Sequence, residues 1–237
     1  MSPAQAPRNL ADDFVLLNHH LHAGGGRDAA MKRIVELAVG SIPGCDWAAI
    51  TAWPVKRQPR SLAASHEVAS AADRLQYELG EGPCLTAATD SEMVQLVDVA
   101  TDEQWPRFSA AAAADTPVRS VMSFHLADLP HRSALNLYSG QAGAFDTEAI
   151  SSAALFAAHA RVLLIHAASA DKAANLENAL STSRQIGAAI GILMNVHKIT
   201  ADQAFELLRE SSQRLNRKLH DIAYDVTQTG TLPNNGW

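Results

Sequence analysis

The stretch from Thr147 to Met194 constrains the fold more than any other part of the chain. It contains no proline, only two glycines, both near its end, and many Ala and Leu residues. Proline breaks the interior of an α-helix, whereas Ala and Leu are among the strongest helix formers. We therefore predict one long helix, or two nearly continuous helices.

A heptad pattern runs along this helix, with two positions that recur every seven residues. The first position holds Leu155, Val162, Ser169, Leu176, Ser183 and Ile190, and the second holds Ala158, Ile165, Lys172, Ala179, Ile186 and Leu193. The resulting seam is apolar at both ends and polar at Ser169 and Lys172, which fits a connector that pairs with a second copy of itself. The alternative is that both ends pack within one chain.

The residues before this helix predict an α+β domain over roughly residues 10 to 168. A first amphipathic helix carries Leu10, Phe14, Leu17 and Leu21 and ends at Gly24–Gly26, and a second buries Ile34, Leu37 and Ala38. Short apolar runs bounded by turn residues predict strands over residues 47–53, 93–97, 120–126 and 133–138. Helices, then strands, then a helix is the order of an α+β domain.

The residues from about Lys172 to Leu232 predict a small three-helix unit. Thr200 and Gln203 have the spacing of a capping box, which starts a new helix. From Ala204 to Val226, apolar residues recur at steps of three and four, so one face of this segment is buried. Asn216 is expected to cap the start of the third helix.

The net charge of −6 hides two different halves of the chain. Residues 1–171 carry 12 basic and 19 acidic side chains, a net charge of −7, whereas residues 172–237 carry seven basic and six acidic, a net charge of +1. Arg209, Ser212 and Asn216 follow steps of three and four, so they line one helical face that offers charge and hydrogen bonds to phosphates. The alternative is an ordinary solvated face.

Aromatic side chains for base stacking are few in this half. We expect Phe205 to be buried, which leaves Tyr224 and Trp237. If the ligand is RNA, contacts to its backbone and to the shape of its loops must then dominate.

Catalytic and metal-binding patterns are absent from the sequence. There is no CxxC pair, no GxxxxGK[ST] loop and no HExxH helix, so an enzyme has no positive support. His19, His20 and His22 cluster, but two neighbouring histidines do not make a metal site, and a solvated histidine face is the simpler interpretation. Cys84, beside Pro83, is a candidate redox or ligand sensor if a helix N-terminus lowers its pKa, and otherwise a small buried side chain.

The sequence favours a cytoplasmic protein. Residues 1–10 lack the apolar core of a signal peptide, and the two cysteines cannot form a disulfide framework. The longest apolar stretch, Ala153–Ala168, is interrupted by His159, Arg161 and His166, which fits a buried or pairing helix rather than a membrane anchor.

Residues 176–226 resemble an ANTAR domain, the small helical RNA-binding module of bacterial transcription antiterminators. The resemblance is carried by the Ser183-Arg184 step, the Gly191-Ile192-Leu193-Met194 run, Ala204-Phe205 with Leu208-Arg209, Ser212, the Asn216-Arg217-Lys218-Leu219 run, and Ala223. One departure is Ile190, where the family often has a lysine that contacts phosphate.

Most of residues 10–168 resemble a GAF domain, the ligand-sensing fold that often precedes ANTAR in actinobacterial regulators. The resemblance is carried by Asp46-Trp47-Ala48, the run from Leu79 through Gly80, Glu81, Gly82 and Pro83 to Cys84, Asp98, Trp105-Pro106, the run from Ala134 through Leu135, Asn136 and Leu137 to Tyr138, and Phe145-Asp146. These motifs mark the fold, an antiparallel sheet flanked by helices, and they name neither ligand nor cofactor.

Together the two resemblances imply a transcription antitermination regulator, with a GAF-like domain at 10–168 and an ANTAR domain at 169–232 between short termini at 1–9 and 233–237. ANTAR modules, usually as dimers, bind paired hairpins in nascent RNA. By that resemblance the RNA-facing residues are Arg184, Arg209, Ser212, Asn216, Arg217 and Lys218, Ala204 is small for close packing, and Leu208 and Leu219 belong to the core. The alternative is a ligand- or redox-sensing module whose helical tail serves dimerisation and docking of a protein partner.

Overall fold

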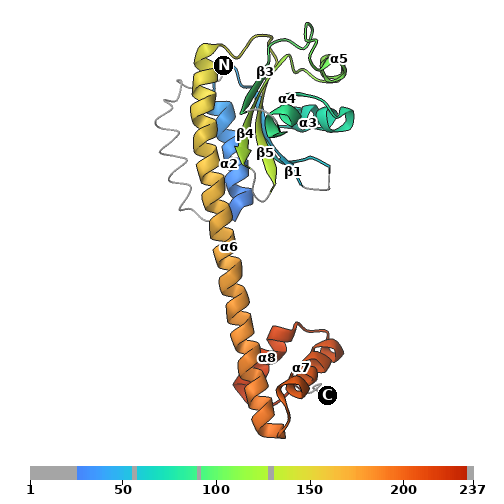
Figure 1. Ribbon diagram of the computed structural model, residues 1–237, viewed down its shortest axis with the longest axis vertical. Helices are drawn as coiled ribbons and strands as arrows, with labels where there is room; N and C mark the ends of the chain where they lie inside the picture. Colours follow the sequence, from blue (N-terminus) through green and yellow to red (C-terminus); the bar gives the residue numbers. More distant parts are fainter. Residues whose placement is uncertain (1–25, 55–57, 90–91, 128–130, 234–237) are drawn as a thin grey trace, which may run out of the picture. The chain divides into compact units, whose positions relative to one another are not determined.

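The computed structural model describes residues 26–54, 58–89, 92–127 and 131–233 (Figure 1). The chain divides into two compact units, the first ending at Asp171 and the second beginning at Lys172. The helix predicted through Leu10 and Leu21, and the cluster of His19, His20 and His22, lie outside the described residues.

A five-stranded antiparallel sheet forms the centre of the first unit. Its strands are β1 (Trp47–Trp53), β2 (Arg60–Ala64), β3 (Met93–Leu96), β4 (Ser120–Ala127) and β5 (Arg132–Ser139), in the spatial order β2-β1-β5-β4-β3. All four predicted strands are confirmed. The edge strand β2 was not predicted, because its sequence, RSLAA, has no β-branched residue and no regular alternation of apolar and polar side chains.

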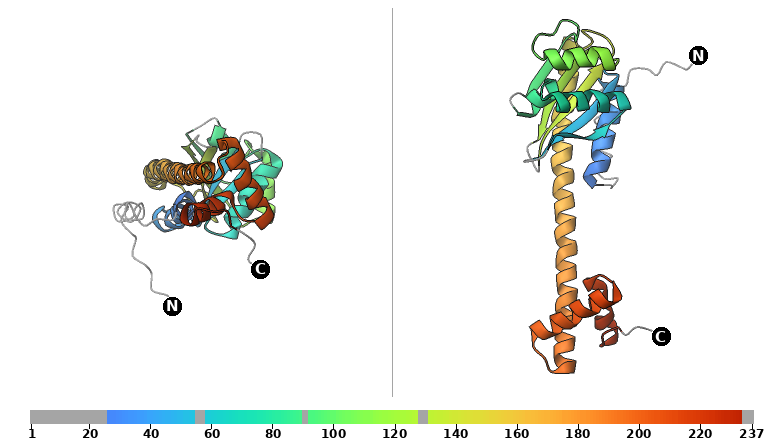
Figure 2. Two further views of the ribbon diagram at one scale, coloured as in Figure 1. Left: turned by 90° about the horizontal axis from the view of Figure 1, so that it is seen from below. Right: turned by 90° about the vertical axis from the view of Figure 1, so that its right-hand side faces the viewer.

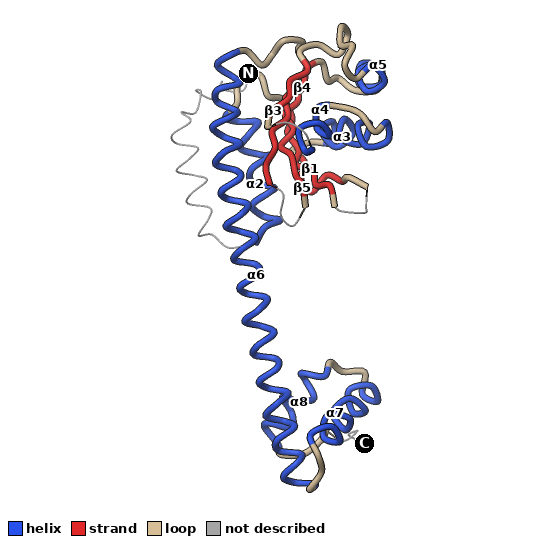
Figure 3. The backbone as a smooth tube through the Cα atoms, in the orientation of Figure 1, coloured by secondary structure: helices blue, strands red, loops and turns tan. Residues whose placement is uncertain are grey.

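Helices cover both faces of the sheet. One face packs on α2 (Gly26–Ser41) and the start of α6 (Thr147–His197), and the other packs on α3 (Glu67–Leu79), α4 (Pro83–Thr89) and α5 (Pro106–Asp115) (Figure 3). The right-hand view of Figure 2 looks onto the second of these faces. Because β1 is buried on both sides, its sequence WAAITAW is apolar except for Thr51 and does not alternate.

The long helix was predicted correctly: α6 is continuous over 51 residues. The Asp146 carboxylate accepts the backbone N–H of Ala149 (2.9 Å) and so caps its start. Among the described residues, α6 is long and apolar enough to cross a membrane by those two criteria alone. Its first half, however, is the core helix of the first unit, because Ala153, Phe156 and Ala160 are fully buried with side chains of the sheet and α2.

The second unit consists of the end of α6 with α7 (Ala201–Leu215) and α8 (Leu219–Thr229). The predicted capping box is confirmed: Thr200 Oγ1 accepts the N–H of Gln203, and the Gln203 side chain accepts the N–H of Thr200. The prediction for Asn216 is wrong. Asn216 ends α7 in the left-handed conformation (φ 49°), which Asn tolerates better than most residues, and Lys218 occupies the N-cap of α8.

Candidate functional site

A small apolar core holds the three helices of the second unit together. It is formed by the fully buried residues Ala189, Leu193, Ala204, Leu208, Ile222, Ala223 and Val226. Leu219 packs against it while partly exposed. The expected core positions Ala204 and Leu208 therefore lie where the resemblance places them.

The outward side of α7 carries a row of side chains that we call the α7 stripe: Phe205, Arg209, Ser212 and Asn216. They are spaced by four, three and four residues, so they lie on one face of the helix. Phe205 was expected to be buried, and this is wrong, because it is 38% exposed. The core-facing residues Ala204, Leu208 and Ser211 each directly precede a member of the α7 stripe. Each is therefore rotated from that member by about 100° around the helix axis.

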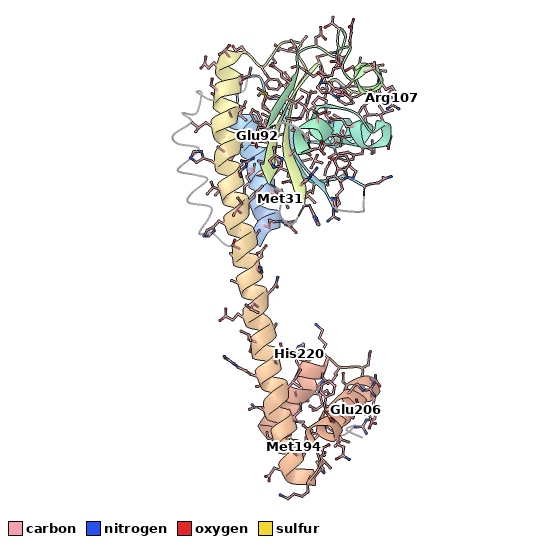
Figure 4. The ribbon with its side chains drawn as sticks, viewed as in Figure 1. Met31, Glu92, Arg107, Met194, Glu206 and His220 are labelled. Atoms are coloured by element: carbon pink, nitrogen blue, oxygen red, sulfur yellow. The ribbon has the colours of Figure 1, made fainter. Side chains whose placement is uncertain are left out.

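Arg209 and Glu206 form an ion pair on the surface of α7. The Glu206 carboxylate accepts hydrogen bonds from Arg209 Nε (2.9 Å) and Nη2 (2.6 Å), and both side chains are about half exposed (Glu206 is labelled in Figure 4). The hydrogen bond and the charge of Glu206 raise the pKa of Arg209 further. An exposed pair of this kind is weak, so a stronger anion can displace the carboxylate.

The turn between α7 and α8 brings together four of the predicted residues: Ser212, Asn216, Arg217 and Lys218. Ser212 Oγ donates to the Arg217 carbonyl (2.6 Å), and the Arg217 N–H donates back to the Ser212 carbonyl (3.1 Å). The Arg217 guanidinium donates to Asp225 on α8 (2.6 Å). Ser212 thus uses its hydroxyl proton to hold the turn in which Arg217 and Lys218 are displayed.

Arg184 and Lys218 are exposed, and neither side chain makes an ion pair within the described part of the chain. Lys218 lies in the turn, two residues after Asn216 of the α7 stripe, whereas Arg184 lies on α6, apart from the other five predicted residues. Cations without an internal partner are the ones most readily available to an anionic ligand.

A buried polar cluster, which the sequence did not reveal, occupies the α3 side of the sheet in the first unit. We call it the Asp73 cluster; it consists of Thr51, Ser61, Asp73, Gln76, Tyr77, Cys84, Asn136 and Tyr138. The fully buried Asp73 carboxyl accepts from Ser61 Oγ (2.6 Å), from Asn136 Nδ2 (2.8 Å) and from the hydroxyl groups of Thr51, Tyr77 and Tyr138. Asn136, in the otherwise apolar run from Ala134 to Tyr138, was the one available signal.

Burial dominates the electrostatics of this cluster. Loss of solvation raises the pKa of the Asp73 carboxyl, although its hydrogen bonds act in the opposite direction. The Cys84 thiol is fully buried and donates to Thr51 Oγ1 (3.3 Å). Burial, followed by the charge of Asp73, raises its pKa, so the lowered pKa expected at a helix N-terminus is not found.

Two polar atoms beside the Asp73 cluster have no hydrogen-bond partner among the described residues. Ser123 on β4 lies directly opposite Asn136 on β5, and Ser123 Oγ and Asn136 Oδ1 are both buried and unpaired. A buried polar atom without a partner is costly, so a hydrogen bond from an added molecule to either of these two atoms would be favourable.

The LGEGPC motif positions the helices above this cluster. Gly82 has a φ of 141° and lies directly against the Gln76 side chain, so a Cβ at this position is not tolerated. That approach lets Gln76 Oε1 accept the N–H of Cys84 (2.8 Å). Glu81 accepts the N–H groups of Arg107 (labelled in Figure 4; 2.7 Å) and Phe108 (3.0 Å) at the start of α5. These motif residues therefore serve the fold.

Comparison with known protein families settles the nature of the second unit. Residues 174–226 match the model of the ANTAR domain. The second unit is an ANTAR domain. The match begins within α6 and ends at Val226 of α8, so it takes in all three helices and the whole α7 stripe.

Solved structures identify the fold of the first unit. The GAF domain of a phosphoenolpyruvate-protein phosphotransferase from Coxiella burnetii shares 14% identity and a TM-score of 0.52, covering 69% of this chain and 97% of that one. The phycoerythrobilin-bound GAF domain of a cyanobacterial phytochrome shares 12% identity and a TM-score of 0.52, covering 68% and 97%. fRMsr of Staphylococcus aureus, in its reduced form, shares 13% identity and a TM-score of 0.53, covering 69% and 99%. No curated protein matches the chain.

The first unit therefore has the GAF fold, and α6 leads from it into the ANTAR domain. At these low identities, similarity to the solved structures shows the fold and does not show function. Within the described residues, no group of three or more His, Cys, Asp or Glu side chains is placed to hold a metal ion.

Proposed function

We propose that this protein is a cytoplasmic, signal-responsive transcription antitermination regulator. Its ANTAR domain binds paired hairpins in nascent RNA, and a ligand or other signal at the GAF unit controls that binding. The observation that carries the proposal is the ANTAR match over residues 174–226, together with exposed basic residues on α6, α7 and the turn that follows α7.

RNA contact is assigned to Arg184, Arg209, Ser212, Asn216, Arg217 and Lys218. Lys218 and Arg184 present cations without internal partners, and Arg209 and Arg217 are held by single exposed or part-exposed carboxylates that a phosphate can replace. Besides contacting RNA, Ser212 and Asn216 fix the turn in which Arg217 and Lys218 stand. A net charge of only +1 favours contacts at selected points over a general coating of nucleic acid.

The proposed homodimer is supported by side chains on α6 that the single chain leaves exposed. The seam residues Leu155, Val162, Ile165 and Leu176 are 45%, 64%, 54% and 60% exposed. Their heptad spacing is that of a helix that pairs with a parallel copy. Two paired α6 helices would carry two ANTAR domains, as recognition of two hairpins requires.

The signal is proposed to act at the Asp73 cluster. The unpaired atoms of Ser123 and Asn136 offer hydrogen bonds there, and α3 and α4 lie over the same face of the sheet. A ligand that binds one arrangement of these helices better than another would shift the equilibrium between them.

The experiment begins with a pool of RNAs that carry two adjacent stem–loops with randomised loop nucleotides. Rounds of selection on the full-length protein yield a probe, whose affinity is then measured between 50 and about 300 mM salt. We expect affinity to fall steeply as salt rises. Lys218→Ala should weaken binding and reduce the salt slope by about one, whereas Lys32→Ala, an exposed lysine on α2, should change neither.

Two results would overturn the proposal. One is a pool that yields no enriched RNA, and the other is an affinity that does not depend on salt or on Lys218. Either outcome would favour the alternative in which the helical tail docks a protein partner.

A further inference from the structure

Phe205 is more exposed than the other large apolar side chains of α7. On α7, Leu208 is fully buried and Leu207 and Leu215 are partly buried, whereas Phe205 is 38% exposed. A phenylalanine that leaves part of its ring in water forgoes much of the free energy its burial would give. The ring surface is therefore available to a binding partner.

The neighbours of Phe205 on the same face leave its ring accessible. Four residues earlier lies Ala201, whose side chain is a single methyl group, and four residues later lies Arg209. The Arg209 guanidinium donates to the carboxylate of Glu206, the residue that follows Phe205 in the sequence. A flat group lying on the ring would thus have a cation beside it.

The chemistry of this arrangement fits an unpaired nucleobase. Every base has a π-face that stacks on an aromatic ring, and the adjoining phosphate is an anion that Arg209 can bind. A protein partner fits less well, because protein contacts use contiguous apolar patches of several hundred Å². Among the exposed large apolar residues, Phe205 is the single one on α7, and its surroundings are charged.

We propose that Phe205 is the stacking platform for one unpaired base in the loop of a bound hairpin, and that Arg209 binds the phosphate beside that base after leaving Glu206. This inference rests on the proposed RNA binding and adds to it a loop-reading contact that is independent of charge. Because stacking involves no phosphate, it contributes to affinity without contributing to the salt dependence.

The test uses the selected two-stem–loop RNA and four variants of the full-length protein. Phe205→Ala and Phe205→Leu should both weaken binding, by roughly 5- to 150-fold, the range for loss of one stacked base. Phe205→Trp should bind as well as the unmodified protein. Tyr224→Ala removes the other exposed aromatic among the described residues of the second unit, on α8 beside Asp225, and should bind normally; Trp237 lies outside those residues.

Three further readouts separate stacking from loss of structure, and a fourth tests the role of Arg209. The salt slope of Phe205→Leu should equal that of the unmodified protein, and hydrogen exchange in α7 and α8 should be unchanged. Single 2-aminopurine substitutions along the loop should identify one position whose fluorescence is quenched by the unmodified protein and by Phe205→Trp, but not by Phe205→Leu. Glu206→Gln should tighten binding by about 2- to 5-fold, because it frees Arg209 from a surface pair.

The outcomes distinguish this inference from the function on which it rests. If the unmodified protein binds no RNA, the proposed function fails and the inference fails with it. If the unmodified protein binds the probe with the expected salt dependence but Phe205→Leu binds equally well, the inference alone is overturned. A loss of binding by Phe205→Leu that is accompanied by faster exchange in α8 would also overturn it, in favour of a structural role.

Discussion

Ser211 and Ser212 are adjacent on α7 but have opposite hydrogen-bonding states. The Ser211 hydroxyl is buried against the ANTAR core and has no partner among the described residues, whereas the Ser212 hydroxyl donates to the Arg217 carbonyl (2.6 Å). A buried hydroxyl without a hydrogen-bond partner lowers the free energy of unfolding, whereas a hydrogen-bonded hydroxyl raises it. The two serines therefore form a matched pair for mutation.

The first prediction concerns the stability of the ANTAR domain. We expect Ser211→Ala to raise its free energy of unfolding by about 1 kcal/mol, because the change removes an unpaired polar atom, and Ser212→Ala to lower it by about 1 kcal/mol. Hydrogen exchange in the peptides that cover α7 and α8 measures both effects. Destabilisation by Ser211→Ala would show that its hydroxyl has a partner that the structure does not contain.

Ionisation of Asp73 gives a prediction on pH dependence. Because burial raises its pKa in the folded chain, the stability it contributes is fully present below the unfolded pKa, about 3.9, and is lost as the pH rises through the raised folded value. Asp73→Asn cannot ionise. We therefore expect this variant to gain stability relative to the unmodified protein as the pH rises above about 4.

Urea unfolding, followed by the fluorescence of the tryptophans of the GAF unit, measures this trend between pH 4 and 8. Asp115→Asn, at an exposed position at the end of α5, is the matched control for the effect of the substitution itself. A difference for Asp73→Asn that stays constant over the whole pH range would contradict the assignment of a raised pKa.

The sequence predicted the parts of the fold whose hydrophobic pattern is strong. β1, β3, β4 and β5 are apolar runs between turn residues, and α6 is long and free of proline. It did not predict α3, because the side of that helix that faces the interior carries the polar residues Asp73 and Gln76 and so lacks a normal apolar stripe. Polar residues are buried there because side chains on β1, β2 and β5 satisfy them, and this is tertiary information.

The candidate sites were predictable to different degrees. The basic residues around Arg209 and Lys218 follow from the ANTAR resemblance, but whether a given cation is already paired, as Arg217 is with Asp225, depends on the turn between two helices. The exposure of Phe205 depends on which neighbouring residue faces the core. The partners of Asp73 are separated from it by up to 65 residues in the sequence, so no local pattern identifies them.

The role of Cys84 as a redox sensor stays a prediction, and chemical modification tests it. The thiolate is the reactive form of cysteine, and burial both raises the pKa of Cys84 and blocks access to it. We expect its alkylation by iodoacetamide at pH 8 to be more than about tenfold slower in the folded protein than in urea. A cysteine introduced at exposed Ala113 should react at the unfolded rate. Rapid modification of Cys84, measured by mass spectrometry, would support the sensor hypothesis instead.

The seam of α6 gives a final prediction, on assembly. Leu176 lies on the heptad seam and is 60% exposed, whereas Asn178, two positions along, is exposed but outside the seam. In a dimer paired through this seam, Leu176→Asp places a charge at a buried position and should weaken association by about 100-fold. Asn178→Asp adds the same charge on a solvated face and should leave it unchanged. Because both side chains are exposed in the single chain, neither substitution disturbs its fold.

Sedimentation velocity over a range of concentrations measures the dissociation constants. Equal values for the two variants would mean that any dimer forms through another surface, and the proposed recognition of two hairpins would then require the RNA itself to bring two ANTAR domains together.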